Sequence, residues 1–309
     1  MSAASGRLWT AGTLFFDYWP ARVRHSRGWL QGRQYLPNAD PLLFNAAATC
    51  CDEKAKALVS TRPLNRLLHG LQELEMSTHA LTTIGFDADD TLWQNEQYYR
   101  LTEEHFRELL ADFAEGPKIS ERLLEAEKRN LSHYGFGIKG FTLSMIETAI
   151  EITEGKVPTS VIAQILDTGR DLLSHPVETM PHVRETLEAL SGNYLLVLIT
   201  KGDLFDQERK LAQSGLGDFF DAVEIVSEKT AVTYRRVFSK VGDGPERAMM
   251  VGNSLKSDIV PAIAAGSYGV FVPHELTWVL EHVDEPKDAP RFRKIAHLGE
   301  LGSLLGGLS

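Results

Sequence analysis

The stretch LTTIGFDADDTLW, residues 81–93, decides the fold. Its apolar run IGF, residues 84–86, predicts a short buried strand, because turn-forming residues follow it at once. Side chains two residues apart on an extended chain point to the same side, so Asp87 and Asp89 can face one site. Open parallel α/β sheets bind ligands beyond the carboxyl ends of their strands. The stretch therefore predicts a site at this edge of a sheet.

Asp87, Asp89 and Asp90 lie within four positions and repel one another unless a cation or protons compensate their charge. A hard divalent cation with oxygen ligands, Mg²⁺, is the simplest compensation. In the alternative interpretation, the three aspartates form a polar turn that caps the next helix. The stretch by itself is compatible with both interpretations.

The composition is that of an ordinary globular protein: the 309 residues are 43% hydrophobic and 24% charged. The formal net charge of −10 argues against a role in binding nucleic acid or a membrane surface. No apolar run approaches the roughly 20 residues that span a bilayer. The only cysteines are Cys50 and Cys51, and an adjacent pair cannot form a disulfide framework. We therefore expect a cytoplasmic protein.

Residues 1–76 differ from the rest of the chain. Residues 1–75 hold nine Lys and Arg against six Asp and Glu, which gives this stretch a net charge of +3 and leaves −13 for the remainder. Such asymmetry often marks an appended tail. We expect a poorly ordered or wrongly translated extension, with the folded domain starting near Met76. An organelle-targeting segment and a helical addition are the alternatives.

Residues 95–175 carry the apolar spacing of amphipathic helices. Four such helices in succession, joined by short loops, predict a small bundle. Because the bundle interrupts an α/β pattern, we expect it to be an inserted cap domain. The catalytic core would then consist of residues 77–94 and 176–309.

The α/β alternation resumes after the bundle. Strand-like runs at residues 194–199, 222–226, 248–251 and 268–272 alternate with helical segments. This order predicts right-handed βαβ units, and hence a Rossmann-like, doubly wound parallel sheet. Polar residues follow the strands: Thr200, Lys229, Asn253 and Asp258.

This ordered set resembles the four motifs of the haloacid dehalogenase superfamily of phosphotransferases and hydrolases. The matching residues are Asp87-Ala-Asp89-Asp-Thr91, the strand that ends in Thr200, Lys229, and Gly252-Asn-Ser-Leu-Lys-Ser-Asp258. The resemblance covers about residues 80–275, and the helical insert is similar to that of the superfamily's helical-cap subgroup. It implies a Mg²⁺-dependent phosphohydrolase that acts on a small phosphorylated metabolite.

The resemblance also implies catalytic roles. Asp87 would be the nucleophile that forms an aspartyl-phosphate, and Asp89 would be the general acid and base. Crowding by Asp87 and Asp90 would let Asp89 share its proton. Thr200 would hydrogen-bond a phosphoryl oxygen, and Lys229 would neutralise its charge.

For the metal, the resemblance implies that Asp87, the backbone carbonyl of Asp89, Asn253 and Asp258 hold Mg²⁺. Superfamily members often have Asp where this chain has Asn253. The amide oxygen still suits Mg²⁺, but it lacks the negative charge, so we expect weaker metal binding unless another carboxylate compensates.

Four further residues are expected to contact the substrate: Thr91, Trp93, Lys139 and Lys201. Trp93 would wall the pocket. Lys139 belongs to the glycine-containing segment 134–140, which would reach over the opening or else form only a turn between two helices. The structural alternatives for the motif residues are a helix cap for Thr200 and a solvated surface lysine for Lys229.

The carboxyl group of Asp89 favours hydrolysis of phosphate esters over dehalogenation, since a halide leaves without protonation. A phosphomutase remains an alternative, because the same two aspartates would serve it. A non-catalytic binding protein on this fold is a further alternative, and Asn253 is the one feature in its favour.

Overall fold

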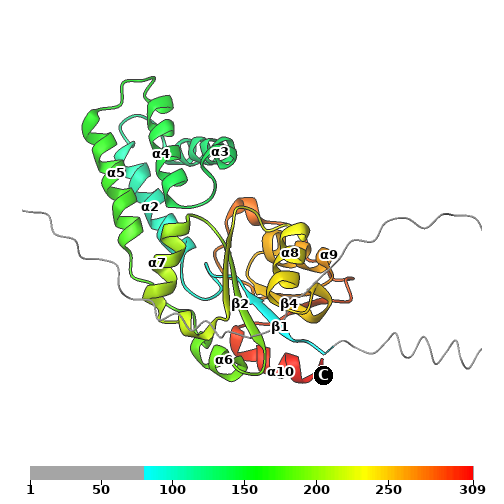
Figure 1. Ribbon diagram of the computed structural model, residues 1–309. Helices are drawn as coiled ribbons and strands as arrows, with labels where there is room; N and C mark the ends of the chain where they lie inside the picture. The colour runs from blue at the N-terminus through cyan, green and yellow to red at the C-terminus, as the bar shows by residue number, and fades with distance from the viewer. Residues whose placement is uncertain (1–79, 309) are drawn as a thin grey trace, which may run out of the picture. The chain divides into compact units, whose positions relative to one another are not determined.

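The computed structural model describes residues 80–308 of the chain (Figure 1). The expected N-terminal extension, residues 1–76, lies outside the described residues.

Six parallel strands form one sheet in the order β3-β2-β1-β4-β5-β6. Their bounds are Thr83–Phe86 (β1), Leu195–Lys201 (β2), Ala222–Val226 (β3), Ala248–Gly252 (β4), Tyr268–Phe271 (β5) and Phe292–Lys294 (β6). Every residue of β1 is buried, and the strand lies between β2 and β4. The chain therefore leaves the centre of the sheet directly at Asp87.

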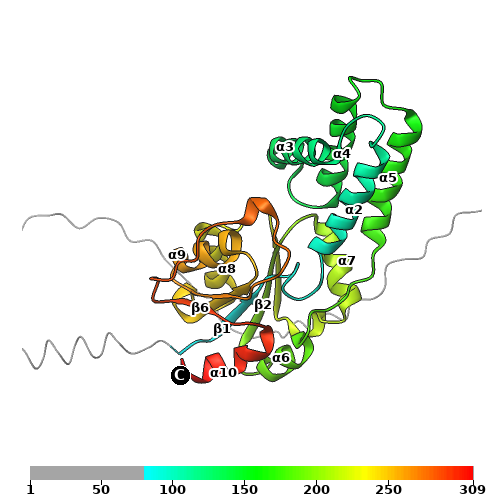
Figure 2. The ribbon, with the colours of Figure 1, turned by 180° about the vertical axis from the view of Figure 1, so that it is seen from behind.

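Helices cover both faces of the sheet (Figure 2). Their bounds are Val183–Leu190 (α6), Leu204–Ser214 (α7), Ala231–Val241 (α8), Val260–Ala265 (α9) and Leu301–Gly306 (α10). Leu196 and Leu198 of β2 pack in one core with α6 and α10, whereas the alternate residues Val197 and Ile199 pack against α8 and α9. This period of two is what a strand buried on both faces requires.

Five short helical turns complete the core. They are Gly217–Phe219 (η1), Pro245–Arg247 (η2), Leu255–Ile259 (η3), Val279–Glu281 (η4) and Leu298–Glu300 (η5). All are 3₁₀ turns except η3, which is a π-helical turn immediately before α9. None of the helices within residues 80–308 has the length and apolar character needed to cross a membrane.

Four helices lie between β1 and α6 in sequence and share a hydrophobic core of their own. Their bounds are Glu96–Leu109 (α2), Gly116–Tyr134 (α3), Ile138–Ile152 (α4) and Thr159–Ser174 (α5). The two connecting segments run side by side: the Gln94 amide donates to the Glu178 carbonyl and the Met180 amide to the Leu92 carbonyl, each at 2.9 Å. We call α2–α5 the helical insert.

The fold predicted from the sequence, a parallel α/β sheet with an inserted helical bundle, is confirmed. The boundaries of the insert as a separate domain stay a prediction. Strand β6 and the helical turns were not predicted.

Candidate active site

Asp87 is the first residue after β1, and its side chain is almost completely buried. One carboxylate oxygen, Oδ1, accepts a hydrogen bond from the Lys229 ammonium. The other, Oδ2, accepts from the Thr91 hydroxyl at 3.2 Å. Both oxygens are thus held in place by groups from two different loops, the one that follows β1 and the one that follows β3.

Lys229 is only 6% exposed, so the alternative of a solvated surface lysine is wrong. Its Nζ also donates to Oδ1 of Asp258 at 2.7 Å, and the backbone amide of Ser254 donates to the other oxygen of Asp258 at 2.9 Å. We call Asp87, Lys229 and Asp258 the sheet-edge cluster.

The sheet-edge cluster has two carboxylates for one ammonium. Burial, and then repulsion by Asp258, raise the pKa of Asp87 to about 7 although Lys229 acts in the opposite direction. Burial disfavours the charged form of Lys229, but Asp258 and Asp87 outweigh it, so the pKa of the ammonium is raised. The residual negative charge calls for a further cation or a proton.

Asp87 and Asn253 are the oxygen donors that fit a magnesium ion here. Besides Asp87, the Thr91 hydroxyl also contacts Asn253. It lies 3.3 Å from Oδ1 of Asn253 and accepts from the backbone amide of Asn253 at 3.1 Å. Mg²⁺ usually keeps several waters and takes only one or two protein carboxylates, so a small set of oxygens suffices. No group of three or more His, Cys, Asp or Glu within residues 80–308 is arranged as a metal site.

The role of Asp258 as a metal ligand stays a prediction, and the structure shows which other contacts this residue makes. Its side chain is 0% exposed, and both carboxylate oxygens are already bonded, one to Lys229 and the other to the Ser254 amide. Its contacts are those of a residue that positions Lys229.

Asp89 is held by three donors: the Trp93 indole at 2.8 Å, the Gln207 amide at 2.8 Å and the Lys210 ammonium at 3.0 Å. Burial favours the protonated form, but the charge of Lys210 and the three hydrogen bonds outweigh it, so the pKa of Asp89 is lowered. In this conformation the contacts of Asp89 favour its ionised form, and the expected sharing of its proton with Asp87 and Asp90 stays a prediction.

Asp90 alone behaves as the helix-capping interpretation predicted. Its backbone is in the left-handed region, with φ of 60°. Its carboxylate accepts from the backbone amides of Asn95 at 2.8 Å and Glu96 at 3.0 Å, at the start of α2. The capping interpretation therefore holds for Asp90, whereas the cation interpretation of Asp87 and Asp89 stays a prediction.

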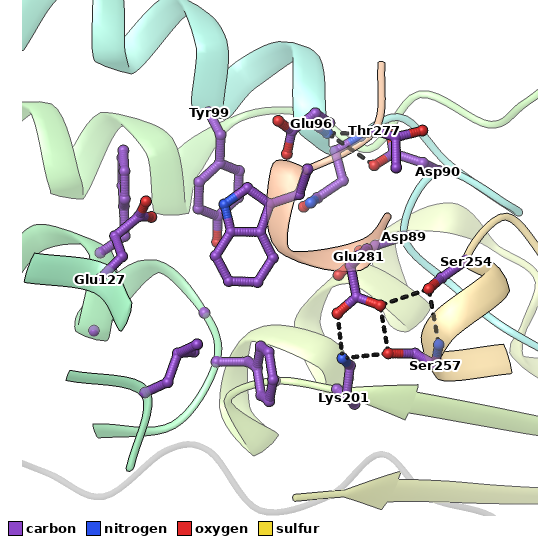
Figure 3. Close-up of a pocket in the computed structure, with 18 of the residues that line it drawn as sticks. Asp89, Asp90, Glu96, Tyr99, Glu127, Lys201, Ser254, Ser257, Thr277 and Glu281 are labelled. Carbon is purple, nitrogen blue, oxygen red and sulfur yellow. Dashed lines mark hydrogen bonds and ion pairs between the residues drawn. The ribbon is translucent and has the colours of Figure 1, made fainter. Parts of the chain in front are cut away.

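Thr200 lies within β2 and is buried, and its hydroxyl donates to the Lys201 carbonyl at 3.3 Å. It does not cap α7, since that role belongs to Asp203, which accepts from the Asp206 amide at 3.2 Å. Lys201 donates to Glu281 and to the Ser257 hydroxyl, each at 2.8 Å. Figure 3 shows this network, in which the Ser254 hydroxyl also donates to Glu281.

A cavity of about 400 Å³ lies between these residues and helices α2, α3 and α4. Its lining includes most of the predicted site residues: Asp87, Asp89, Thr200, Lys201, Lys229, Asn253 and Asp258. The cavity thus joins the carboxyl edge of the sheet to the helical insert.

Three predicted substrate contacts do not line the cavity. Thr91 is buried, and its hydroxyl donates to Asp87. Trp93 is completely buried and points its indole at Asp89 because the turn after β1 folds back, with the Leu92 amide donating to the Ala88 carbonyl at 2.8 Å. Lys139 is 60% exposed and pairs with Asp203 at 2.9 Å.

The sequence interpretation missed Gln207, Lys210, Trp278 and Glu281, all of which line the cavity. Gln207 and Lys210 lie three residues apart on one face of α7, and a helix that begins next to a predicted site residue could have drawn attention to that face. Trp278 immediately precedes η4 and Glu281 is the last residue of this turn, and no sequence motif marks either of them.

The fold and the cavity together are typical of α/β enzymes, with a cluster of carboxylates at the carboxyl edge of a parallel sheet. Residues 81–266 match the family model of haloacid dehalogenase-like hydrolases. The chain belongs to this family of hydrolases.

Similar proteins agree with this assignment. A crystal structure of a haloacid dehalogenase-like family hydrolase from Xanthomonas campestris is 44% identical, with a TM-score of 0.67 over 74% of this chain and 92% of that one. Glyceraldehyde 3-phosphate phosphatase from Methanothermobacter thermautotrophicus is 28% identical over 203 residues, 64% of this chain and 88% of the relative. Pyrimidine 5'-nucleotidase YjjG from Escherichia coli is 28% identical over 134 residues, which are 41% of this chain and only 56% of that relative.

Proposed function

We propose that the protein hydrolyses phosphoric monoesters of small metabolites, with Asp87 as nucleophile and Mg²⁺ as cofactor. The observation that carries the proposal is the setting of Asp87: a buried carboxylate at the end of the central strand, oriented by Lys229 and Thr91, that opens onto a cavity of about 400 Å³. The relatives named as a phosphatase and a nucleotidase support the same reaction class.

In the first half-reaction, the Asp87 carboxylate attacks phosphorus, a new oxygen–phosphorus bond forms, and the bond to the leaving oxygen breaks. Thr200 and Lys229 line the cavity next to Asp87, where a hydroxyl and an ammonium stabilise the charge of the transferring phosphoryl group. In the second half-reaction, water attacks phosphorus and releases Asp87 together with inorganic phosphate.

Asp89 serves the two half-reactions in different protonation states. The contacts with Lys210, Gln207 and Trp93 favour the ionised form, which suits the second step, where a proton leaves the attacking water. To protonate the leaving oxygen in the first step, the carboxyl group must exchange at least one of these contacts for the substrate.

Asp87, Asn253 and Asp258 would hold Mg²⁺, together with the backbone carbonyl of Asp89. When bound, the ion supplies positive charge that lets a carboxylate approach a phosphate dianion. The raised pKa of Asp87 is consistent with this role, since the cluster lacks one compensating charge.

The experiment is an assay of p-nitrophenyl phosphate hydrolysis by the purified chain, with Mg²⁺ and with excess EDTA. We expect activity that depends on Mg²⁺ and falls by roughly a thousandfold or more in Asp87→Asn, whose amide can still bond to Thr91. Circular dichroism of the variant confirms that it is folded. Retention of more than a tenth of the activity in Asp87→Asn would exclude Asp87 as the nucleophile.

A further inference from the structure

The cavity is strongly acidic. Eleven carboxyl groups line it, against four cationic side chains. Each of the four cations already contacts a carboxylate at 3.0 Å or less: Lys229 with Asp87 and Asp258, Lys210 with Asp89, Lys201 with Glu281, and Arg100 with Glu96. Three of these ammonium groups are thereby held inside the site, and only Arg100, which contacts Glu96 through Nε and is 43% exposed, keeps nitrogens for another anion.

The carboxylates on the side of the helical insert are in a different situation. Glu103 of α2 and Glu127 of α3 have no cationic partner among residues 80–308 within salt-bridge distance. Tyr99 and Trp278 also line the cavity, and the Trp278 side chain acts to lower the pKa of Glu127. We call Tyr99, Glu103, Glu127 and Trp278 the acidic wall.

Figure 3 shows Glu127 and Tyr99 projecting from their helices toward the same space, on the side opposite Lys201 and Glu281. Burial, then repulsion by Glu103 and Glu96, raise the pKa of Glu127 to about 7. A cation placed beside Glu127 would oppose this burial and repulsion and favour the ionised carboxylate. The faces of tyrosine and tryptophan rings attract cations as well.

A second observation also points to a ligand that donates hydrogen bonds. Gln207 lines the cavity and is 3% exposed, and its Oε1 has no hydrogen-bond partner among the described residues. Its Nε2 is fixed by Asp89 and by the Lys201 carbonyl, so the amide cannot turn over to satisfy the oxygen. A buried carbonyl oxygen is satisfied only by a donor, and none of the described residues supplies one to Gln207.

We propose that the acidic wall selects phosphoric monoesters whose leaving group carries a protonated amine, and disfavours esters with a carboxylate or a second phosphate. The inference rests on the proposed phosphatase function and names the substrate class of the same site. The amine would pair with Glu127 and Glu103 and lie against the rings of Tyr99 and Trp278, while the phosphate occupies the position next to Asp87.

The test uses the full chain and three alkyl phosphates of equal length that end in an amine, a hydroxyl or a carboxylate, each with a two-carbon and a four-carbon chain. The assay is run at about pH 8, where an ordinary amine is protonated and Glu127 is ionised. We expect kcat/KM for the amine to exceed that for the hydroxyl by about tenfold or more, and the carboxylate to be the poorest substrate.

Glu127→Gln is the decisive variant, because it removes the charge and keeps the shape. The ratio of kcat/KM for amine to hydroxyl should fall by about tenfold. Glu125→Gln is the matched control: Glu125 lies on the same helix, is exposed and pairs with Arg122 at 2.9 Å, and it does not line the cavity. Its ratio should equal that of the wild type.

Failure of the inference is distinct from failure of the proposed function. Equal rates for amine and hydroxyl esters at both chain lengths, or a ratio unchanged by Glu127→Gln, would refute the selection by the acidic wall while leaving the phosphatase intact. The absence of phosphate release from every ester, including p-nitrophenyl phosphate, would refute both.

Discussion

The sheet-edge cluster and the acidic wall face the same cavity, but their charges are balanced in different ways. At the sheet edge, the ammonium of Lys229 lies between Asp87 and Asp258, and each of the three side chains is oriented by at least one direct bond. In the acidic wall, Glu103 and Glu127 repel each other and form no ion pair, and the charge of Arg100 only partly offsets the burial and repulsion that raise the pKa of Glu127.

The difference indicates two uses of buried charge. A group that must attack a phosphorus atom is best held in one position before the substrate arrives, and the sheet-edge cluster achieves this with internal ion pairs. A group that must recognise a substrate is best left uncompensated until the substrate supplies the opposite charge. Mutations that remove one charge from each region should therefore have opposite effects on stability.

Lys229→Met should have the largest effect, because it leaves Asp87 and Asp258 buried without their counter-ion. We expect the free energy of unfolding to fall by about 3–5 kcal/mol, measured by urea denaturation near neutral pH, and phosphatase activity to fall to background. Adding Asp258→Asn to this variant should recover part of the stability, since one uncompensated charge is then removed. A loss below about 1 kcal/mol in the single variant would show that the pairing is not needed.

Glu127→Gln should have a smaller effect of the opposite sign. Because the pKa of Glu127 is raised to about 7 in the fold from 4.5, its protonated form stabilises the protein at low pH, and this contribution is lost as pH rises from 4.5 through about 7. The variant should therefore be more stable than the wild type by about 1 kcal/mol near pH 8 and no more stable below about pH 4.5.

The control for this prediction is again Glu125→Gln, which should leave the free energy of unfolding unchanged within about 0.5 kcal/mol at both pH values. If Glu127→Gln destabilised the protein near pH 8, Glu127 would have to be paired in the free enzyme, and the contrast between the two regions would disappear.

The sheet-edge cluster could be predicted from the sequence for a physical reason. Parallel strands bring their carboxyl ends to one edge, so Asp87, Lys229 and Asp258 converge although they are far apart in the chain. Helices α6 and α7 could be predicted from local periodicity, because their bounds match the pattern of apolar residues.

The environment of Asp89 could not be predicted in this way. Trp93 turns inward because the loop after β1 folds back on itself, and Lys210 reaches Asp89 only through the packing of α7 beside that loop. Glu281 reaches Lys201 from a 3₁₀ turn of three residues, and β6 is equally short, so neither element spans enough residues to show a period.

Lys139→Ala should have the smallest effect and decides between two interpretations of the loop between α3 and α4. The sequence interpretation expects Lys139 to contact the substrate, whereas in the structure it forms an exposed ion pair with Asp203. Exposed pairs contribute about 0.2–1 kcal/mol and are screened by salt. We therefore expect a loss of stability within that range, which vanishes at about 1 M salt, and a change in kcat/KM of no more than about twofold.

Lys156→Ala is the matched control, since Lys156 is 80% exposed and its nearest carboxylate, that of Glu154, is 3.8 Å away in the same insert. A drop in kcat/KM of more than about tenfold in Lys139→Ala alone would instead place this ammonium on the substrate, because a change of that size exceeds what an exposed ion pair can supply.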